Sequence, residues 1–176
     1  MSQALLKVTD LKKSYGAIQA VDGVSFEVRP GEIFGVIGPN GSGKTTMFNS
    51  VLGQITPNSG SIEFKGQNIT GVTPLSLSRL GVGRTFQTLQ VFGKMSVRDN
   101  LIVAAQEHSG SLLGRLFAPT DSGLGEKADA LIDQFRLRHV AHQLAGSLSY
   151  GQQKLVDIAM AFMADPDLVL LDEPCA

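Results

Sequence analysis

Hydrophobic residues recur along the chain in short runs whose spacing predicts alternating strands and helices. Loose alternation from Ile18 to Val28, which stops at the turn dipeptide Pro30-Gly31, predicts a strand. The continuous apolar run Ile33 to Ile37 predicts a strand buried on both faces. A similar run from Leu168 to Leu171 predicts a second strand of this kind.

Other segments complete this alternation. Helical spacing and end signals predict helices near residues 44–52, 74–80, 96–107, 126–137 and 151–163, and shorter apolar runs predict strands near 5–8, 62–64 and 82–87. The Gly/Ser/Pro-rich stretch His108 to Gly125 is predicted to be a mobile insertion. Strands that alternate with helices around apolar strands indicate an α/β fold with a parallel central sheet.

Composition narrows the class of protein. A chain of 176 residues is expected to form one domain, at about 150 residues per domain. The formal net charge of −1 argues against a nucleic-acid-binding protein, which usually carries a basic surplus. The single cysteine excludes an internal disulfide, and no apolar run reaches the ~18–20 residues of a membrane helix. The 20 glycines indicate either many turns or a backbone that approaches a ligand closely.

The first chemical motif is the run Gly38-Pro39-Asn40-Gly41-Ser42-Gly43-Lys44-Thr45, between a predicted buried strand and a predicted helix. Glycines let backbone N–H groups converge on phosphate oxygens, and the positive end of the helix favours an anion. Lys44 would supply charge to the β- and γ-phosphates, and Thr45 a hydroxyl for Mg²⁺. The motif therefore predicts a nucleotide-binding phosphate loop.

A second motif, Asp172-Glu173, follows the apolar run Leu168 to Leu171. Ligands of parallel sheets bind at the carboxyl ends of the strands, where two acids would serve a phosphate loop. Asp172 is expected to hold Mg²⁺ through water, and Glu173 to orient or deprotonate the attacking water. Without the phosphate loop, the same residues would be an acidic turn after a buried strand.

A third segment, Leu148-Ser149-Tyr150-Gly151-Gln152-Gln153, opens a predicted helix. Its spacing fits an anion-binding helix N-terminus and equally fits a simple helix cap. The three segments in this order resemble the ATP-binding subunit of an ABC transporter, with Leu148 to Gln153 similar to the signature motif of that family. Tyr150 departs from the commonest form of the motif, which has glycine there.

The resemblance covers the whole chain and implies a P-loop NTPase fold of the ABC ATPase type. A mostly parallel core sheet, N-terminal antiparallel strands and a helical subdomain at about 89–151 are expected within one domain, 1–176. The resemblance assigns Tyr15, in the loop after the first strand, to adenine stacking, and Gln87 to sensing Mg²⁺ and the attacking water. The expected ATP contacts are Tyr15, Gly38, Pro39, Asn40, Gly41, Ser42, Gly43, Lys44, Thr45, Thr46, Ser149, Gly151 and Gln152. The expected Mg²⁺ ligands are Thr45, Gln87 and Asp172, and the expected catalytic residues are Glu173, Lys44 and Gln87.

The resemblance also implies partners and a place in the cell. Two copies, or this chain and a sister ATPase subunit, would sandwich two ATP molecules, and permease subunits would dock on residues 88–100. The apolar residues of that segment fit a docking surface and a core equally well. Such a subunit would be cytoplasmic and peripheral on the inner face of the cell membrane, with no nucleic acid as partner. Gly83 to Gln87, the insertion and Glu173-Pro174-Cys175-Ala176 resemble the branched-chain amino acid importers in particular.

Alternatives to an importer subunit remain at this point. A soluble ABC ATPase outside transport and a nucleotide-binding module without catalysis are both compatible with the motifs, whereas a small P-loop kinase does not need Leu148 to Gln153. Members of this family continue past the acidic pair Asp172-Glu173 to a switch histidine. The chain is therefore expected to be a C-terminally incomplete fragment, which would be inactive when isolated.

Overall fold

The computed structural model describes residues 3–85, 89–106 and 123–171. The chain divides into two compact units, Met1–Leu80 and Gly81–Ala176, which are described separately. The expected positions Gln87, Asp172 and Glu173, and most of the predicted insertion, lie outside the described residues.

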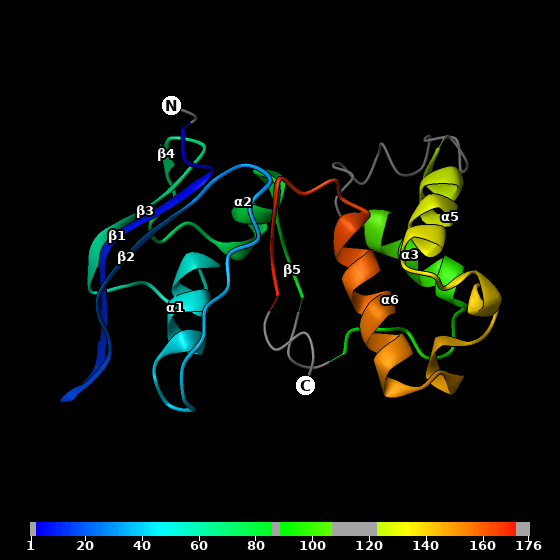
Figure 1. Ribbon diagram of the computed structural model, residues 1–176, viewed down its shortest axis with the longest axis horizontal. Helices are drawn as coiled ribbons and strands as arrows, with labels where there is room; N and C mark the ends of the chain where they lie inside the picture. Colours follow the sequence, from blue (N-terminus) through cyan, green and yellow to red (C-terminus); the bar gives the residue numbers. More distant parts are fainter. Residues whose placement is uncertain (1–2, 86–88, 107–122, 172–176) are drawn as a thin grey trace. The chain divides into compact units, whose positions relative to one another are not determined.

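The first unit contains a four-stranded antiparallel sheet in the order β2-β1-β3-β4. Its strands are β1 (Leu6–Tyr15), β2 (Ile18–Val28), β3 (Ser59–Phe64) and β4 (Gln67–Asn68). The α1 helix (Lys44–Val51) packs against β1 and β2, beside the sheet in Figure 1. The short α2 helix (Pro74–Arg79) begins at Thr73, whose hydroxyl accepts the Ser76 N–H. The predicted N-terminal antiparallel strands are therefore confirmed, although β1 is longer than expected.

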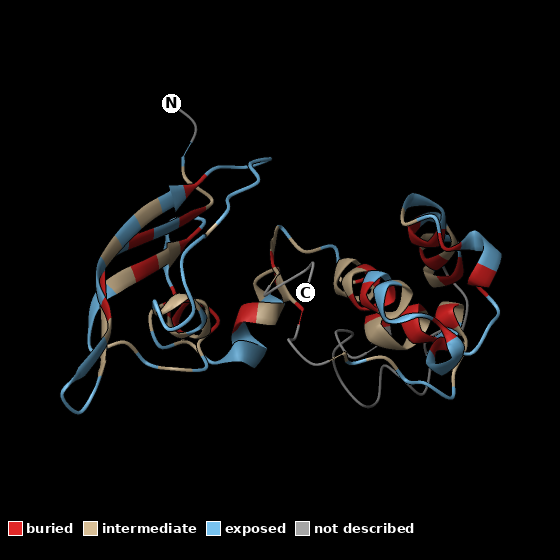
Figure 2. Ribbon diagram, turned by 60° about the horizontal axis from the view of Figure 1, so that its bottom comes forward, coloured by how far each residue is buried: buried red, intermediate tan, exposed pale blue. Residues whose placement is uncertain are grey.

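Alternation along the strands creates the core of this unit. The side chains of Leu6, Val8 and Leu11 on β1 are buried, and so are Ile62 and Phe64 on the neighbouring β3. In Figure 2 these buried positions interrupt the exposed ones along the sheet, as expected when only one face is covered.

The prediction of a doubly buried strand at Ile33 to Ile37 is wrong. These residues form no strand, and Ile33 is 100% and Ile37 96% exposed. Phe34 is partly covered because its ring stacks on Phe26 with centroids 5.0 Å apart. An apolar run becomes a buried strand only where neighbouring strands bond its backbone, and no described residue pairs with this one.

The described residues of the second unit form a parallel pair of strands and three packed helices. The β5 strand (Val82–Arg84) pairs with β6 (Leu168–Leu170) in the register Val82↔Leu168, Gly83↔Val169 and Arg84↔Leu170. Their parallel direction agrees with the predicted parallel sheet, but the expected burial of β6 on both faces is wrong. Only Leu170 of its three residues is buried, because β5 is its one partner among the described strands.

The three helices are α3 (Val97–Gln106), α5 (Leu124–Gln134) and α6 (Tyr150–Phe162), with α3 packed on both of the others. Two single 3₁₀ turns, η1 (Arg138–Val140) and η2 (Ala145–Ser147), connect α5 to α6. The predicted cap at Ser96 is confirmed, since its hydroxyl accepts the Asp99 N–H at 3.1 Å. α5 starts at Leu124 rather than at the predicted Glu126, so Gly125 belongs to the helix and not to the insertion.

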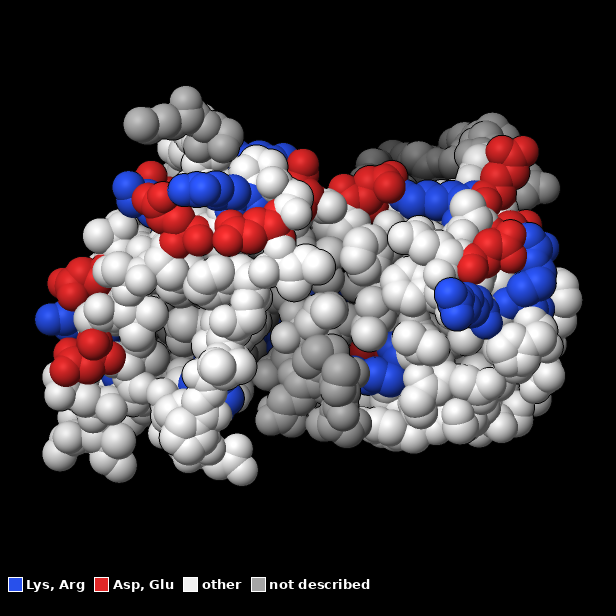
Figure 3. Space-filling view, in the orientation of Figure 1, with Lys and Arg blue, Asp and Glu red and all other residues white. Residues whose placement is uncertain are grey.

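Apolar side chains join these helices into one core cluster, the buried residues between the helices in Figure 2. Its fully buried members include Val97 and Leu101 from α3 and Val156 from α6. Acidic and basic side chains lie in mixed groups on the surface, as Figure 3 shows for one face. Arg98 donates to both oxygens of Asp129, at 2.9 and 3.3 Å, and these bonds lower the pKa of that carboxyl.

The junction between the first sheet and α1 leaves no space for a side chain. Gly43, the residue before α1, has a φ of 86°, and a Cβ there would lie 1.9 Å from the Ala20 carbonyl oxygen of β2. Gly16, in the β1–β2 turn, also has a positive φ, but a Cβ there would meet nothing within 4 Å. A comparison of substitutions at the two glycines therefore distinguishes the effect of backbone strain from that of steric exclusion.

We expect Gly43→Ala to destabilise the protein far more than Gly16→Ala. The left-handed conformation costs an alanine about 1–2 kcal/mol at either site, and the overpacked contact at position 43 adds about 1–3 kcal/mol. Urea unfolding of both variants measures the difference. Equal losses in the two variants would contradict the steric exclusion at Gly43.

Truncation of Leu101 should destabilise the helical unit. Leu101 is fully buried, so Leu101→Ala should cost about 2–5 kcal/mol through lost burial and the cavity that remains. The matched variant Leu144→Ala removes an exposed side chain and should change the free energy of unfolding by less than about 0.5 kcal/mol. Chemical unfolding followed by circular dichroism compares the two. A small effect at Leu101 would show that the helices are not held by this cluster.

Candidate nucleotide-binding site

The loop from Gly38 to Gly43 is built to present backbone groups. Gly41 and Gly43 have φ values of 82° and 86°, in the region that disfavours side chains, and the Ser42 N–H donates to the Pro39 carbonyl at 3.2 Å. Gly43 precedes the first residue of α1 and provides no side-chain cap, and the first turn of the helix has no acidic residue. The positive end of α1 is therefore uncompensated by side chains and suits an anion.

Lys44 brings a positive charge back over this loop. Its ammonium group donates to the carbonyl oxygens of Gly38 at 2.8 Å and Pro39 at 2.7 Å. Thr45 is exposed, and Thr46 follows it in the same turn of α1. An anion with several oxygens, such as a polyphosphate, fits this combination of N–H donors, ammonium and hydroxyl. The structure thus gathers the predicted residues 38–46 into one loop and helix start.

Tyr15 lies in a different place from the one expected. It is the last residue of β1, paired with Ile18, and not part of a loop after the strand. β1 extends this far because β2 continues to pair with it up to the turn at Gly16. Tyr15 is half exposed, and the Lys13 Nζ lies over its ring, 5.4 Å from the ring centroid.

The parallel strands of the second unit end at the same edge. The Thr85 N–H, just after β5, donates to the Leu170 carbonyl of β6 at 3.1 Å. The chain leaves β5 towards Gln87 and leaves β6 towards Asp172 and Glu173, although these three residues lie outside the described part. In the described ranges, no group of three His, Cys, Asp or Glu side chains could hold a metal ion. The expected Mg²⁺ ligands Gln87 and Asp172 stay predictions.

Ser149 forms a capping box at the start of α6. Its hydroxyl accepts the Gln152 N–H at 3.4 Å, and its own N–H donates to the Gln152 Oε1 at 3.1 Å. The helix-cap interpretation is therefore confirmed. Gly151 is exposed with nothing within 4 Å of a virtual Cβ, and the Tyr150 side chain is exposed. Ser149 and Gly151 thus lie on an open helix N-terminus that could also receive an anion.

Sequence reasoning missed two buried polar residues in the helical unit that contains this helix start. Asn100 of α3 and Asp157 of α6 are buried, and both bond to the backbone that follows β5. Burial raises the pKa of Asp157, an effect that the Gln90 N–H and then Lys154 partly offset. The signal was available, since each of these polar residues interrupts the apolar stripe of an otherwise amphipathic helix.

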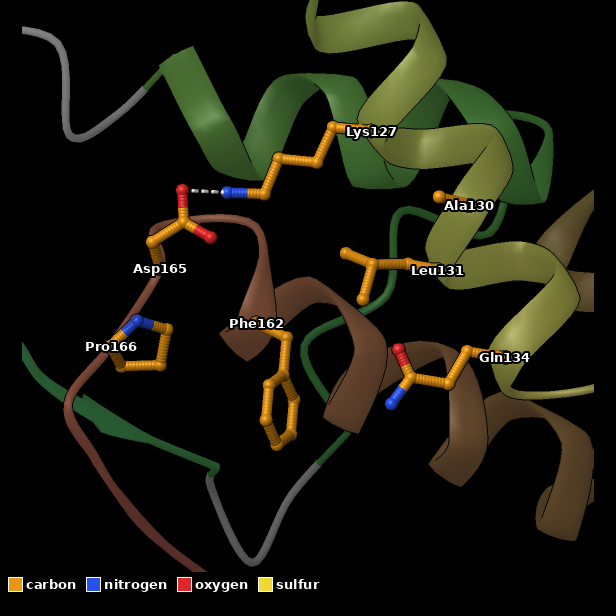
Figure 4. Close-up of a pocket in the computed structure, with 7 residues that line it drawn as sticks. All are labelled: Lys127, Ala130, Leu131, Gln134, Phe162, Asp165 and Pro166. Atoms are coloured by element: carbon orange, nitrogen blue, oxygen red, sulfur yellow. Dashed lines mark ion pairs between the residues drawn. The ribbon is translucent and has the colours of Figure 1, made fainter. Parts of the chain in front are cut away.

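The helical unit also has a shallow pocket of about 340 Å³. Figure 4 shows its lining, which comes from α5, from the last residue of α6 and from the turn after it: Lys127, Ala130, Leu131, Gln134, Phe162, Asp165 and Pro166. Lys127 pairs with Asp165 across it. None of the residues predicted to bind nucleotide lines this pocket.

No helix in the described ranges has the length and apolar character needed to cross a membrane.

Comparisons with known proteins assign a family to this arrangement. The family model described as ABC transporter matches residues 21–176. The probable branched-chain amino acid transport ATP-binding protein LivG of Methanocaldococcus jannaschii is 37% identical over an alignment of 176 positions, which covers 98% of this chain and 68% of that protein. The high-affinity LivG of Escherichia coli K12 is 37% identical over 182 residues, covering 100% of this chain and 71% of its own length.

Solved structures agree with this assignment. The ADP conformation of an ATP-binding cassette of an ABC transporter superposes with a TM-score of 0.86 at 36% identity, over 99% of this chain and 70% of that one. The cbiO1 structure from Clostridium perfringens, part of the cbiONQ transporter complex, gives a TM-score of 0.83 at 27% identity, over 99% of this chain and 67% of that one. The expected α/β fold is thereby confirmed. The matched family, the relatives and the phosphate loop together show that this chain belongs to the ATP-binding subunits of ABC transporters, which are ATP hydrolases.

Proposed function

We propose that this chain hydrolyses ATP to power the import of branched-chain amino acids through membrane permease subunits. The phosphate loop is the observation that carries the proposal, because Lys44 and the uncapped start of α1 suit the phosphates of a nucleotide. The names of the two LivG relatives suggest the solute, as does the resemblance of Gly83 to Gln87 to these importers.

The roles of the site residues are those that the motifs and the family resemblance imply. Backbone N–H groups from Gly38 to Gly43 would hold the phosphates, Lys44 would neutralise the β- and γ-phosphates, and Tyr15 would stack on adenine. Thr45, Gln87 and Asp172 would hold Mg²⁺, which offsets negative charge on the phosphates when bound. Glu173 would orient or deprotonate the attacking water.

A second ATPase subunit would complete each site. In a head-to-tail dimer, the phosphate loop of one chain faces Ser149, Gly151 and Gln152 of the other. The open start of α6 supports this role, since Gly151 leaves room for a phosphate and the Ser149 hydroxyl can turn from Gln152 to a new acceptor. Homodimers and heterodimers with a sister subunit satisfy the same geometry.

Permease subunits would meet the chain at the segment that follows Gln87. Phe92 is 45% exposed there, whereas Val91 packs against the helical core. The exposed Phe92 supports the docking role of the segment, and the packed Val91 supports its role in the core. Docking on a permease would hold the subunit on the inner face of the cell membrane.

Removal of the Lys44 ammonium should weaken nucleotide binding. Lys44→Ala should raise the dissociation constant for ATP by about tenfold or more, because a charged hydrogen bond to phosphate contributes about 1.5–3 kcal/mol. Titration with a fluorescent ATP analogue measures the change. Lys7→Ala, which removes an exposed lysine paired with Glu27 on the sheet, is the control and should bind normally. Equal affinity in the two variants would argue against the phosphate-loop role.

Neutralising Glu173 should separate binding from hydrolysis. Glu173→Gln should retain ATP in a stable dimer while turnover falls by about 10²–10⁴-fold, because the side chain no longer accepts a proton. Size-exclusion chromatography with ATP and a phosphate-release assay measure the two effects. Glu126→Gln, an exposed position in the first turn of α5, should leave both unchanged. Unchanged turnover in Glu173→Gln would contradict the assigned role.

Transport itself requires the membrane subunits. Co-purification with permeases and ATP hydrolysis stimulated by branched-chain amino acids would support the importer assignment. A soluble ABC ATPase outside transport would hydrolyse ATP without such partners. Binding without any hydrolysis in a single-turnover assay would indicate a non-catalytic nucleotide-binding module.

A further inference from the structure

The segment from Leu89 to Ser96, here called the 89–96 segment, is joined by backbone bonds to the turn ahead of α6. The Ala145 N–H donates to the Met95 carbonyl at 2.9 Å, and the Gly146 N–H donates to the Gly93 carbonyl at 3.0 Å. Ser96 and Leu144 form an isolated antiparallel bridge. These bonds connect the segment to residues only a few positions before Ser149.

Two glycines permit this close approach. A Cβ on Gly146 would lie 3.0 Å from the carbonyl oxygen and 3.2 Å from the Cα of Gly93. Both contacts are with backbone, which cannot rotate aside as a flexible side chain would. A side chain at position 146 would therefore force the 89–96 segment and the η2 turn apart by a few tenths of an ångström.

Asn100 of α3 holds the middle of the segment from one side. Its Oδ1 accepts the Phe92 N–H at 2.7 Å, and its Nδ2 donates to the carbonyl oxygens of Phe92 at 3.1 Å and Ser96 at 2.9 Å. The amide is fully buried and bonded at both ends. A satisfied buried amide of this kind specifies one backbone conformation.

Asp157 of α6 holds the beginning of the segment from the other side. Its side chain is only 5% exposed, and its Oδ1 accepts the Gln90 N–H at 3.3 Å. The buried Oδ2 has no hydrogen-bond partner in the described part of the chain. Burial raises the pKa of this carboxyl, so the ionised group is disfavoured here compared with water.

Packing alone does not account for an acid at this position. A hydrophobic residue of similar volume would fill the α6 stripe beside Val156 and Ala159 without the desolvation cost of a carboxylate. The bond to the Gln90 N–H is the specific contact that an apolar residue would lose. Asp157 lies about two turns along α6 from Ser149. At a rise of 1.5 Å per residue, this separation is about 12 Å.

We propose that Asp157 is a positioning residue that binds the 89–96 segment to α6, so that this segment and the Ser149 end of the helix move as one body. This inference rests on the proposed function, in which the segment meets a permease and Ser149 meets the nucleotide of the partner subunit. A push on Phe92 then reaches Ser149 along two routes. One is the Gln90–Asp157 bond, and the other is the pair Gly93–Gly146.

The test compares four variants of the chain assembled with its permease subunits. Asp157→Ala removes the acceptor, and Asp157→Asn keeps an Oδ1 that can accept the Gln90 N–H. Asp129→Ala is the control, because it breaks a contact between α3 and α5 in the same unit without touching the 89–96 segment. Gly146→Ala serves as an independent second probe, because its Cβ would displace the segment from the η2 turn by a few tenths of an ångström.

Hydrogen exchange and steady-state ATP hydrolysis are the two measurements. Asp157→Ala should speed exchange of the Gln90, Ala145 and Gly146 amides together and lower the permease-stimulated kcat by about tenfold, while the KM for ATP stays within about twofold. Asp157→Asn should recover most of the lost kcat, and Gly146→Ala should reproduce the loss. Asp129→Ala should leave kcat and these amides unchanged, even where it lowers the unfolding temperature.

Several outcomes overturn the inference. An unchanged stimulated kcat in Asp157→Ala, or an equal fall in Asp129→Ala, would show that Asp157 has no more than a structural role. Faster exchange at Gln90 without any change at Ala145 and Gly146 would show that the two contacts do not act together. If the wild-type assembly itself hydrolyses no ATP, the proposed function fails. The exchange data on the same variants then decide by themselves whether Asp157 holds the segment to α6.

Discussion

The close approach of the Ala20 carbonyl oxygen to Gly43, where a Cβ would lie 1.9 Å from that oxygen, is the constraint on which the nucleotide site depends. Only a hydrogen atom fits there, and the left-handed φ of Gly43 turns the chain directly into α1. A helix that begins after such a glycine has no side-chain cap, so its first N–H groups remain for a ligand. The same turn leaves Lys44 able to reach back to the Gly38 carbonyl. One steric restriction thus sets the donors and the charge of the site together.

The helical unit combines an apolar core with polar contacts that differ in their free-energy cost. Arg98 and Asp129 join α3 and α5 at the surface, where water screens the pair and its contribution to stability is small. Asn100 is buried with its hydrogen bonds satisfied, whereas Asp157 is buried with one oxygen unpaired. Natural proteins tolerate such a cost where it secures a particular arrangement. Here the arrangement links the backbone after β5 to the helix that starts at Ser149.

Much of the fold follows from local pattern, and the exceptions share a physical cause. Ile18 to Val28, the α1 helix after Gly43 and the cap at Ser96 were predicted correctly because alternation, glycine and capping act over a few residues. Ile33 to Ile37 was wrongly predicted to be a buried strand, since burial depends on neighbouring strands and not on the run itself. Tyr15 was misplaced for the same reason, because pairing with β2 extends β1 up to it.

The amino-acid sequence by itself determined the phosphate loop, the capped start of α6 and the family to which the chain belongs. These features depend on residue types at fixed spacing, which act through backbone conformation and local hydrogen bonds. Only the tertiary structure decided that Asp157 bonds to Gln90 and that Gly93 approaches Gly146. The partners in these contacts lie 67 and 53 residues apart along the chain. No local pattern specifies such pairs, because packing of whole helices brings them together.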